Sequence, residues 1–159
     1  MFVAVMIITA CQTKTKIVPV DTAAAKVAVT TVLDKYNSAM KGKDINVLMT
    51  LLTEDGLYCG TDSKEFLDKT ALSNMMNQTL ADTSLVFDYS IDKREIRIAA
   101  DGNSAVSVEQ MFVKVFSQKM PMRIVYHLVK NGDNWLIDFI SWSFIPNNED
   151  LGKLNKALE

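Results

Sequence analysis

The sequence predicts an α+β domain in which three helices are followed by a curved antiparallel sheet. Two observations support this class. Apolar residues recur at helical spacing between residues 22 and 81, and four longer extended runs, separated by turn signals, occupy residues 84–145. Helices that precede an antiparallel meander are typical of α+β domains, where the helices cover one face of the sheet.

The first helix is predicted from Thr22 to Met40, because one apolar stripe runs along it, formed by Val29, Leu33, Tyr36 and Met40. Gly42 ends this helix. Asp44 is placed to cap a second helix, whose inward face consists of Val47, Leu48, Leu51 and Leu52.

A short strand is predicted from Gly56 to Gly60. The residues from Asp62 to Glu65 have the spacing of a capping box, in which the first side chain accepts from the amide of the last while the last reaches back. We therefore expect a third helix that begins at this box and ends at about Ala81.

The extended runs are expected at 84–99, 104–116, 120–129 and 134–145, with turns at 101–103 and 131–132. Alternation along the last hairpin predicts an inner face, covering the helices, that consists of Met122, Ile124, Tyr126, Leu128, Trp135, Ile137, Phe139 and Ser141. The same parity places Glu109 and Met111 on this face. Residues 147–159 are expected to form a short closing helix or tail.

The outer face of the same hairpin is predicted to carry Arg123, Val125, His127, Val129, Leu136, Asp138, Ile140 and Trp142. It is too apolar for an ordinary solvated surface, so we expect it to meet a second copy of the chain in a homodimer. His127 and Asp138 lie within diagonal reach and are expected to form a cross-strand pair or a dimer contact.

The composition restricts the possible functions. The 159 residues form one domain's worth of chain, and 17 basic against 19 acidic residues give 17 − 19 = −2. Nucleic acid would favour a basic surface, so none is expected as a partner. One histidine and two cysteines disfavour most protein-ligated zinc sites, and we predict neither a metal nor a cofactor.

The N-terminus carries an uncharged apolar run, residues 1–10, that has the length of a signal-peptide core. Residues 8–11, which end at Cys11, resemble the lipobox of bacterial lipoproteins. The resemblance implies cleavage before Cys11, lipidation of its thiol and an envelope protein facing the periplasm, with residues 11–21 as a tether. The alternative is a buried N-terminal segment or first strand, in which case the protein would be cytoplasmic.

The order of elements resembles the SnoaL-like, nuclear transport factor 2-like superfamily of cone-shaped, cystatin-like α+β domains. The resemblance rests on residues 35–44, 51–56 and 60–65, and on the stretch from Trp135 to Ser143, and it covers about residues 22–146. This superfamily contains both enzymes and binding modules.

Ketosteroid isomerases in this superfamily use an aspartate base, with a tyrosine and a protonated aspartate as the oxyanion hole. The resemblance places Tyr36 at the hydroxyl donor. The position of the base falls on Gly60, with Asp62 two residues further on, and that of the second aspartate falls near Val125. The isomerase set is therefore incomplete.

Glu109 with Tyr126 is the best replacement for an acid–base pair, because a carboxyl in an apolar lining holds its proton near neutral pH. If the alternation along the strand is shifted by one residue, Glu109 instead lies on the solvent-exposed surface. Candidate catalytic residues are thus Glu109, Tyr126 and Tyr36, and the expected ligand pocket consists of Tyr36, Tyr58, Met111, Met122, Tyr126, Phe139 and Ser141.

The sequence favours a lipid-anchored module that binds a small apolar or amphipathic ligand in the cone, without a complete catalytic set. Two alternatives remain open at this point. One is an isomerase, cyclase or hydratase that uses Glu109 and Tyr126. The other is a non-catalytic dimeric assembly module whose outer sheet face is the functional surface.

Overall fold

Each of the first two helices begins directly after an aspartate that caps it. A computed structural model describes residues 21–159, so the proposed signal segment, Cys11 and nearly all of the tether lie outside the described residues. Helix α1 (Thr22–Gly42) begins at Asp21, whose carboxylate accepts hydrogen bonds from the Ala23 and Ala24 amides. Helix α2 (Ile45–Thr50) begins at Asp44, whose carboxylate accepts from the Val47 amide. The predicted cap at Asp44 is confirmed, and Asp21 caps α1 in the same way.

The third helix begins later than predicted. Helix α3 (Lys69–Ala81) is capped by Asp68, not by Asp62. The Glu65 carboxylate does accept from the Asp62 amide, but the Asp62 carboxylate accepts from the Lys64 amide, so these residues form a tight turn. This turn joins β1 (Leu52–Cys59) to the short β2 (Phe66–Leu67), and pairing of the two strands prevents a helix from starting there.

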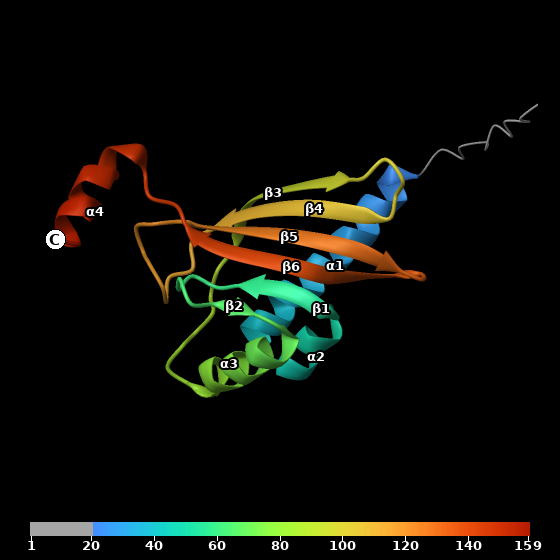
Figure 1. The fold of residues 1–159 in the computed structure, drawn as a ribbon, viewed down its shortest axis with the longest axis horizontal. Coiled ribbons are helices and arrows are strands. Elements are labelled where there is room, and N and C mark those ends of the chain that lie inside the picture. Colours follow the sequence, from blue (N-terminus) through green and yellow to red (C-terminus); the bar gives the residue numbers. More distant parts are fainter. Residues whose placement is uncertain (1–20) are drawn as a thin grey trace, which may run out of the picture.

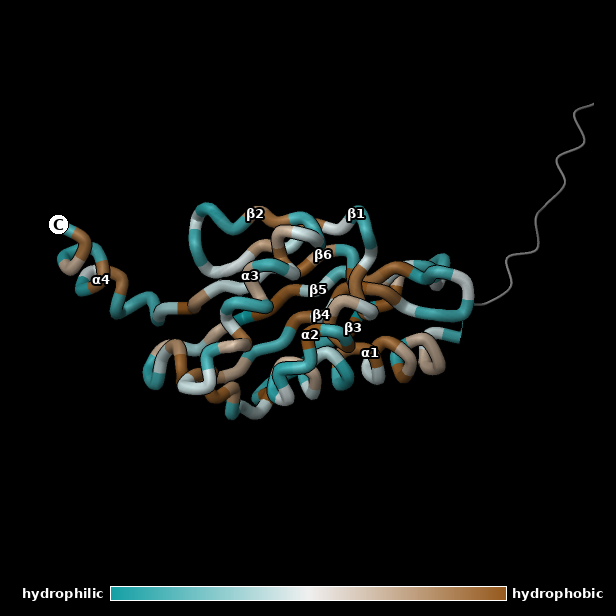
Figure 2. Tube along the Cα trace, turned by 90° about the horizontal axis from the view of Figure 1, so that it is seen from below, coloured by the Kyte–Doolittle hydropathy of each residue, from teal (hydrophilic) through white to brown (hydrophobic). Residues whose placement is uncertain are grey.

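The sheet of the described chain has six strands in the order β2-β1-β6-β5-β4-β3. The long strands are β3 (Ile91–Ile98), β4 (Ser104–Met111), β5 (Met122–Asn131) and β6 (Asn134–Phe144). All neighbours pair antiparallel except β1 and β6, which run parallel. The predicted α+β class is confirmed, with α1, α2 and α3 gathered on one side of a curved sheet (Figures 1 and 2).

The chain ends in a short turn, η1 (Asn148–Asp150), and helix α4 (Leu151–Ala157). Helix α4 extends away from the body of the domain (Figure 1). None of the helices in residues 21–159 has the length and apolar character needed to cross a membrane.

A bulge in β6 reverses the facing predicted for its second half. His127 pairs with Phe139 but the next residue, Leu128, pairs with Ile137, which leaves Asp138 without a partner in this ladder. An extra residue moves every later side chain to the opposite face. Ile140 is therefore buried, and Trp142 packs against the core. The prediction that Phe139 and Ser141 face the helices is wrong. The prediction that Ile140 and Trp142 lie on the outer face is wrong for the same reason.

The other facings follow the predicted alternation. Met122, Ile124, Tyr126 and Leu128 of β5 are all at most 1% exposed, and Trp135 and Ile137 of β6 are buried beside them. On β4, Ser107, Glu109 and Met111 are fully buried. Together with the inner faces of the helices, these residues form the hydrophobic core.

Candidate functional site

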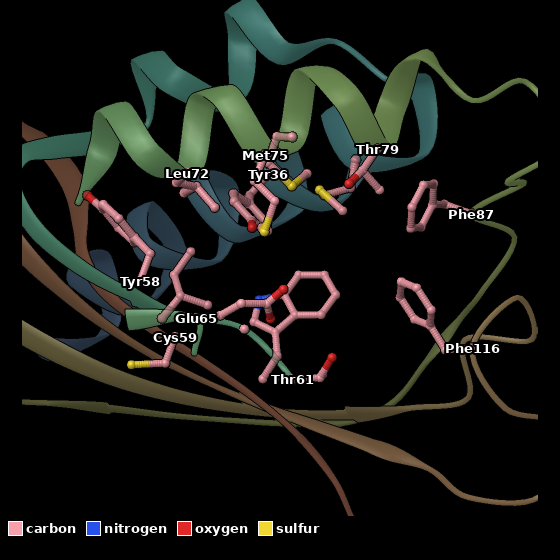
Figure 3. Close-up of a pocket in the computed structure, with 15 residues that line it drawn as sticks. Tyr36, Tyr58, Cys59, Thr61, Glu65, Leu72, Met75, Thr79, Phe87 and Phe116 are labelled. Carbon is pink, nitrogen blue, oxygen red and sulfur yellow. The ribbon is translucent and has the colours of Figure 1, made fainter. Parts of the chain in front are cut away.

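A cavity of about 170 Å³ lies between the helices and the β1–β6 part of the sheet (Figure 3). Helix α1 contributes Tyr36 and Met40, while α3 contributes Leu72, Met75, Met76 and Thr79. The opposite wall comes from the strands, through Tyr58, Cys59, Ile140 and Trp142. Three residues after β1 and two loop phenylalanines complete the lining, namely Gly60, Thr61, Glu65, Phe87 and Phe116.

The two ends of the cavity are both aromatic. At one end, the rings of Phe87 and Phe116 meet edge to face, with centroids 5.8 Å apart and planes at 70°. Tyr58 lies at the other end (Figure 3). Its hydroxyl donates to the Thr53 carbonyl at 2.9 Å, and burial raises the pKa of Tyr58 to about 12. The Tyr58 hydroxyl is thus already satisfied by the backbone.

Tyr36 provides a polar group that the protein leaves available. Its side chain is 4% exposed and lines the cavity. Burial raises the pKa of Tyr36, and so do Tyr89 and Glu109, while a hydrogen bond from the Trp142 indole opposes the shift. Among the described residues, no acceptor takes the Tyr36 O–H, so the hydroxyl can donate to a bound molecule.

Behind Tyr36 lies a buried polar cluster. The Glu109 carboxylate, which is fully buried, accepts from Arg94 Nε at 2.6 Å and from Asn37 Nδ2 at 3.1 Å. The Arg94 Nη1 atom also donates to Asp34 at 2.6 Å, and the Tyr89 hydroxyl donates to the Asn37 carbonyl oxygen at 2.9 Å. One guanidinium therefore joins two carboxylates under α1.

The charged groups of this cluster shift one another's pKa. Burial raises the pKa of Glu109, and the contacts with Arg94 and Asn37 oppose that shift. Burial alone would lower the pKa of Arg94, but the hydrogen bond that Arg94 donates to Asp34 and the charge of Glu109 outweigh this effect, so the net shift of the pKa is upward. The guanidinium remains charged, and it limits how strongly Glu109 holds a proton.

The structure separates the predicted site residues into three groups. Tyr36 and Tyr58 line the cavity. Met111, Met122 and Tyr126 are fully buried in the core and are not among its lining residues. Phe139 and Ser141 pair with His127 and Val125 on the outer face, because of the bulge at Asp138.

The predicted acid–base pair does not reach the cavity. Glu109 is buried on the inner face, as its strand parity predicted, but it lies in the polar cluster and not in the cavity wall. Tyr126 meets Tyr36 edge to face, with centroids 5.6 Å apart. Burial raises the pKa of Tyr126, and the charge of Glu109 raises it further, while the buried Tyr126 hydroxyl has no hydrogen-bond partner among the described residues. Neither candidate residue is therefore among the residues that line the cavity.

Sequence reasoning missed the partners of Glu109. Arg94 lies directly opposite Glu109 in the β3–β4 register, and the alternation used for the last hairpin would have found it if extended to β3. Asn37 follows Tyr36 in α1 and is buried beside it. Within residues 21–159, no three His, Cys, Asp or Glu side chains are grouped so that they could hold a metal ion.

A family model described as a SnoaL-like domain matches residues 29–147, which is most of the chain. The chain belongs to this SnoaL-like family. The domain predicted at residues 22–146 has nearly the same limits. None of the curated proteins is significantly similar to this SnoaL-like protein in sequence.

Solved structures of related shape support the fold of this SnoaL-like domain. A protein of unknown function from the DUF3225 family of Pectobacterium atrosepticum has a TM-score of 0.67 and 20% identity, over 78% of this chain and 93% of that one. An NTF2-like protein of unknown function from Pseudomonas putida has a TM-score of 0.67 and 15% identity, over 81% and 92%. A domain with a cystatin-like fold from Nostoc punctiforme has a TM-score of 0.64 and 12% identity, over 84% and 85%.

Replacing Arg94 should destabilise the protein, and the loss of stability should depend on pH. In Arg94→Met, the fully buried Glu109 carboxylate loses its ion partner, so we expect the free energy of unfolding at pH 8 to fall by about 3 kcal/mol. The loss should be smaller at pH 5. The pKa of Glu109, already raised by burial, rises further in the variant, so the folded state gains a proton as the pH falls and recovers stability.

Urea unfolding at the two pH values measures this difference. Arg97→Met is the matched control, because Arg97 lies on the same strand but is exposed, and its replacement should change the free energy by less than about 0.5 kcal/mol. An equal loss at pH 5 and pH 8 in Arg94→Met would contradict a role for the ionised carboxylate.

Proposed function

We propose that this SnoaL-like protein is a lipid-anchored envelope module whose cavity binds a small apolar or amphipathic molecule. The observation that carries the proposal is the cavity of about 170 Å³ with a mostly apolar wall and an available tyrosine hydroxyl. A cavity of about 150 Å³ lined by apolar side chains is large enough to bind benzene. The ligand is therefore about the size of a single ring.

The polar groups of the wall favour binding over catalysis. The Tyr36 O–H can fix one acceptor of the ligand, and Thr79 and Glu65 lie further along the lining. Acid–base chemistry needs a group within hydrogen-bond reach of the reacting atom. Glu109 and Tyr126 lie behind Tyr36, so the observations give less support to the isomerase, cyclase or hydratase alternative.

Filling the cavity should weaken ligand binding. We expect phenol or cyclohexanol, both small and amphipathic, to bind the full-length chain and to shift the ¹³C-methyl signals of Met40, Met75 and Met76 in an NMR titration. Thr79→Phe places a ring inside the cavity and should weaken binding at least about tenfold.

Thr70→Phe makes the same replacement at an exposed position of the same helix and should leave binding unchanged. If neither probe binds the native chain, or if both variants bind equally well, the cavity is not a ligand site.

The lipid anchor is supported by the sequence of residues 1–11. In a bacterium that processes lipoproteins, the chain should incorporate an alkyne-labelled fatty acid, detected after conjugation to a dye. Cys11→Ser should lose the label completely. Cys59→Ser should keep it, because Cys59 is the other cysteine of the sequence and lies in the cavity wall. Label that survives in Cys11→Ser would refute the anchor.

The outer sheet face is the proposed homodimer surface. Val106, His127, Phe139 and Leu57 are successive partners across β4, β5, β6 and β1, and Val106 and Leu57 are each 42% exposed. His127 Nδ1 and Asp138 Oδ1 lie 2.6 Å apart on this face, as the predicted cross-strand pair. An exposed apolar row of this kind is typical of an interface.

A charged residue introduced into this row of side chains should dissociate the homodimer. We expect the native chain to sediment as a dimer and Val106→Asp to sediment as a monomer, because a carboxylate would be buried at the interface. Val27→Asp is the control, since Val27 is 67% exposed on α1, away from the sheet face, and its replacement should keep the dimer. A native monomer at high concentration would refute this surface.

A further inference from the structure

The wall of the cavity differs in composition from the core around it. Of the fifteen described residues that line it, five are aromatic, four carry sulfur and only Leu72 and Ile140 are branched aliphatic. Of the eighteen buried hydrophobic residues of the described core that do not line the cavity, by contrast, eleven are Leu, Ile or Val. The same chain therefore uses branched aliphatic side chains where it packs against itself and aromatic or sulfur-bearing ones where it leaves space.

Aromatic and sulfur-bearing walls discriminate between ligands of equal size. A ring edge carries partial positive charge and a ring face partial negative charge, so aromatic side chains attract another ring more strongly than a saturated one. Thioether sulfur adds a favourable contact with ring edges. The space is small, and it is bounded by Tyr58 at one end and by the Phe87–Phe116 pair at the other, so a bound ring contacts several of these groups at once (Figure 3).

The charged residues of the cavity wall restrict the class of ligand further. Among the lining residues that the structure describes, Glu65 is the only charged one, and no lysine, arginine or histidine faces the space. A carboxylate on the ligand would find no cation there and would be repelled by Glu65. The Tyr36 O–H, which has no acceptor among the described residues, suits a neutral oxygen.

We infer that the cavity selects a small uncharged aromatic molecule, such as a phenol or an aryl alcohol, over a saturated or anionic molecule of the same size. This inference rests on the proposed ligand-binding function and names its ligand class.

The test compares phenol with cyclohexanol, which has the same hydroxyl and ring size but no π system, on the full-length chain. We expect phenol to bind about tenfold more tightly, since each favourable aromatic pair contributes about two- to twelve-fold. Phenol should also shift the methyl signals of the lining methionines more strongly than cyclohexanol does, because only phenol has a ring current. Benzyl alcohol should bind more tightly than benzoate.

Two matched variants test whether the aromatic end of the cavity causes the preference for phenol. Phe116→Leu removes one ring of the aromatic end and should reduce the preference for phenol to less than about threefold, with little change for cyclohexanol. Phe112→Leu makes the same replacement at an exposed residue outside the lining and should keep the full preference.

The outcomes separate this inference from the function on which it rests. Equal binding of phenol and cyclohexanol would overturn the aromatic selectivity and leave a ligand-binding cavity. Tighter binding of benzoate than of benzyl alcohol would overturn the preference for uncharged ligands. Binding of neither phenol nor cyclohexanol would remove the proposed function itself.

Discussion

The β-bulge at Asp138 determines which side chains of β6 reach the cavity and which reach the outer face. Before the bulge, Trp135 and Ile137 point toward the helices, and after it Ile140 and Trp142 do. Without the extra residue, Phe139 would point inward and Trp142 outward. The cavity would then lose its indole, and the outer sheet face would lose the ring of Phe139. One unpaired residue thus shapes both proposed surfaces.

A second constraint comes from the charge buried under α1. An isolated carboxylate in the core would be strongly unfavourable, and here Arg94 and Asn37 satisfy both oxygens of Glu109. Tyr36 packs against Tyr126 on this side and lines the cavity on the other. The interior of the cone therefore contains a buried polar cluster, whose Arg94 Nη2 atom has no hydrogen-bond partner among the described residues, and a mostly apolar cavity that Tyr36 lines.

The remaining space is small and bounded by side chains that are polarisable or aromatic. Such residues adapt to a guest more readily than branched aliphatic ones, and methionine does so especially, because its unbranched side chain has several rotatable bonds. The two phenylalanines at one end come from loops rather than from strands or helices. The rigid sheet and α1 thus define the depth of the cavity, while less regular segments close it.

The helix cap at Asp44 and the alternation of side chains along β4 and β5 follow from the sequence alone, because both depend on neighbours close along the chain. The sequence also placed Glu109 inside and predicted the fold class from periodicity and turns. The Asp62–Glu65 box was misinterpreted, because a turn between paired strands uses the same residues as a helix start. Only the tertiary structure decided the facing of Phe139 and Ser141, the pairing of Arg94 with Glu109 and the wall of the cavity. A bulge, an ion pair across strands and a space between helices and sheet each depend on segments that meet only after folding.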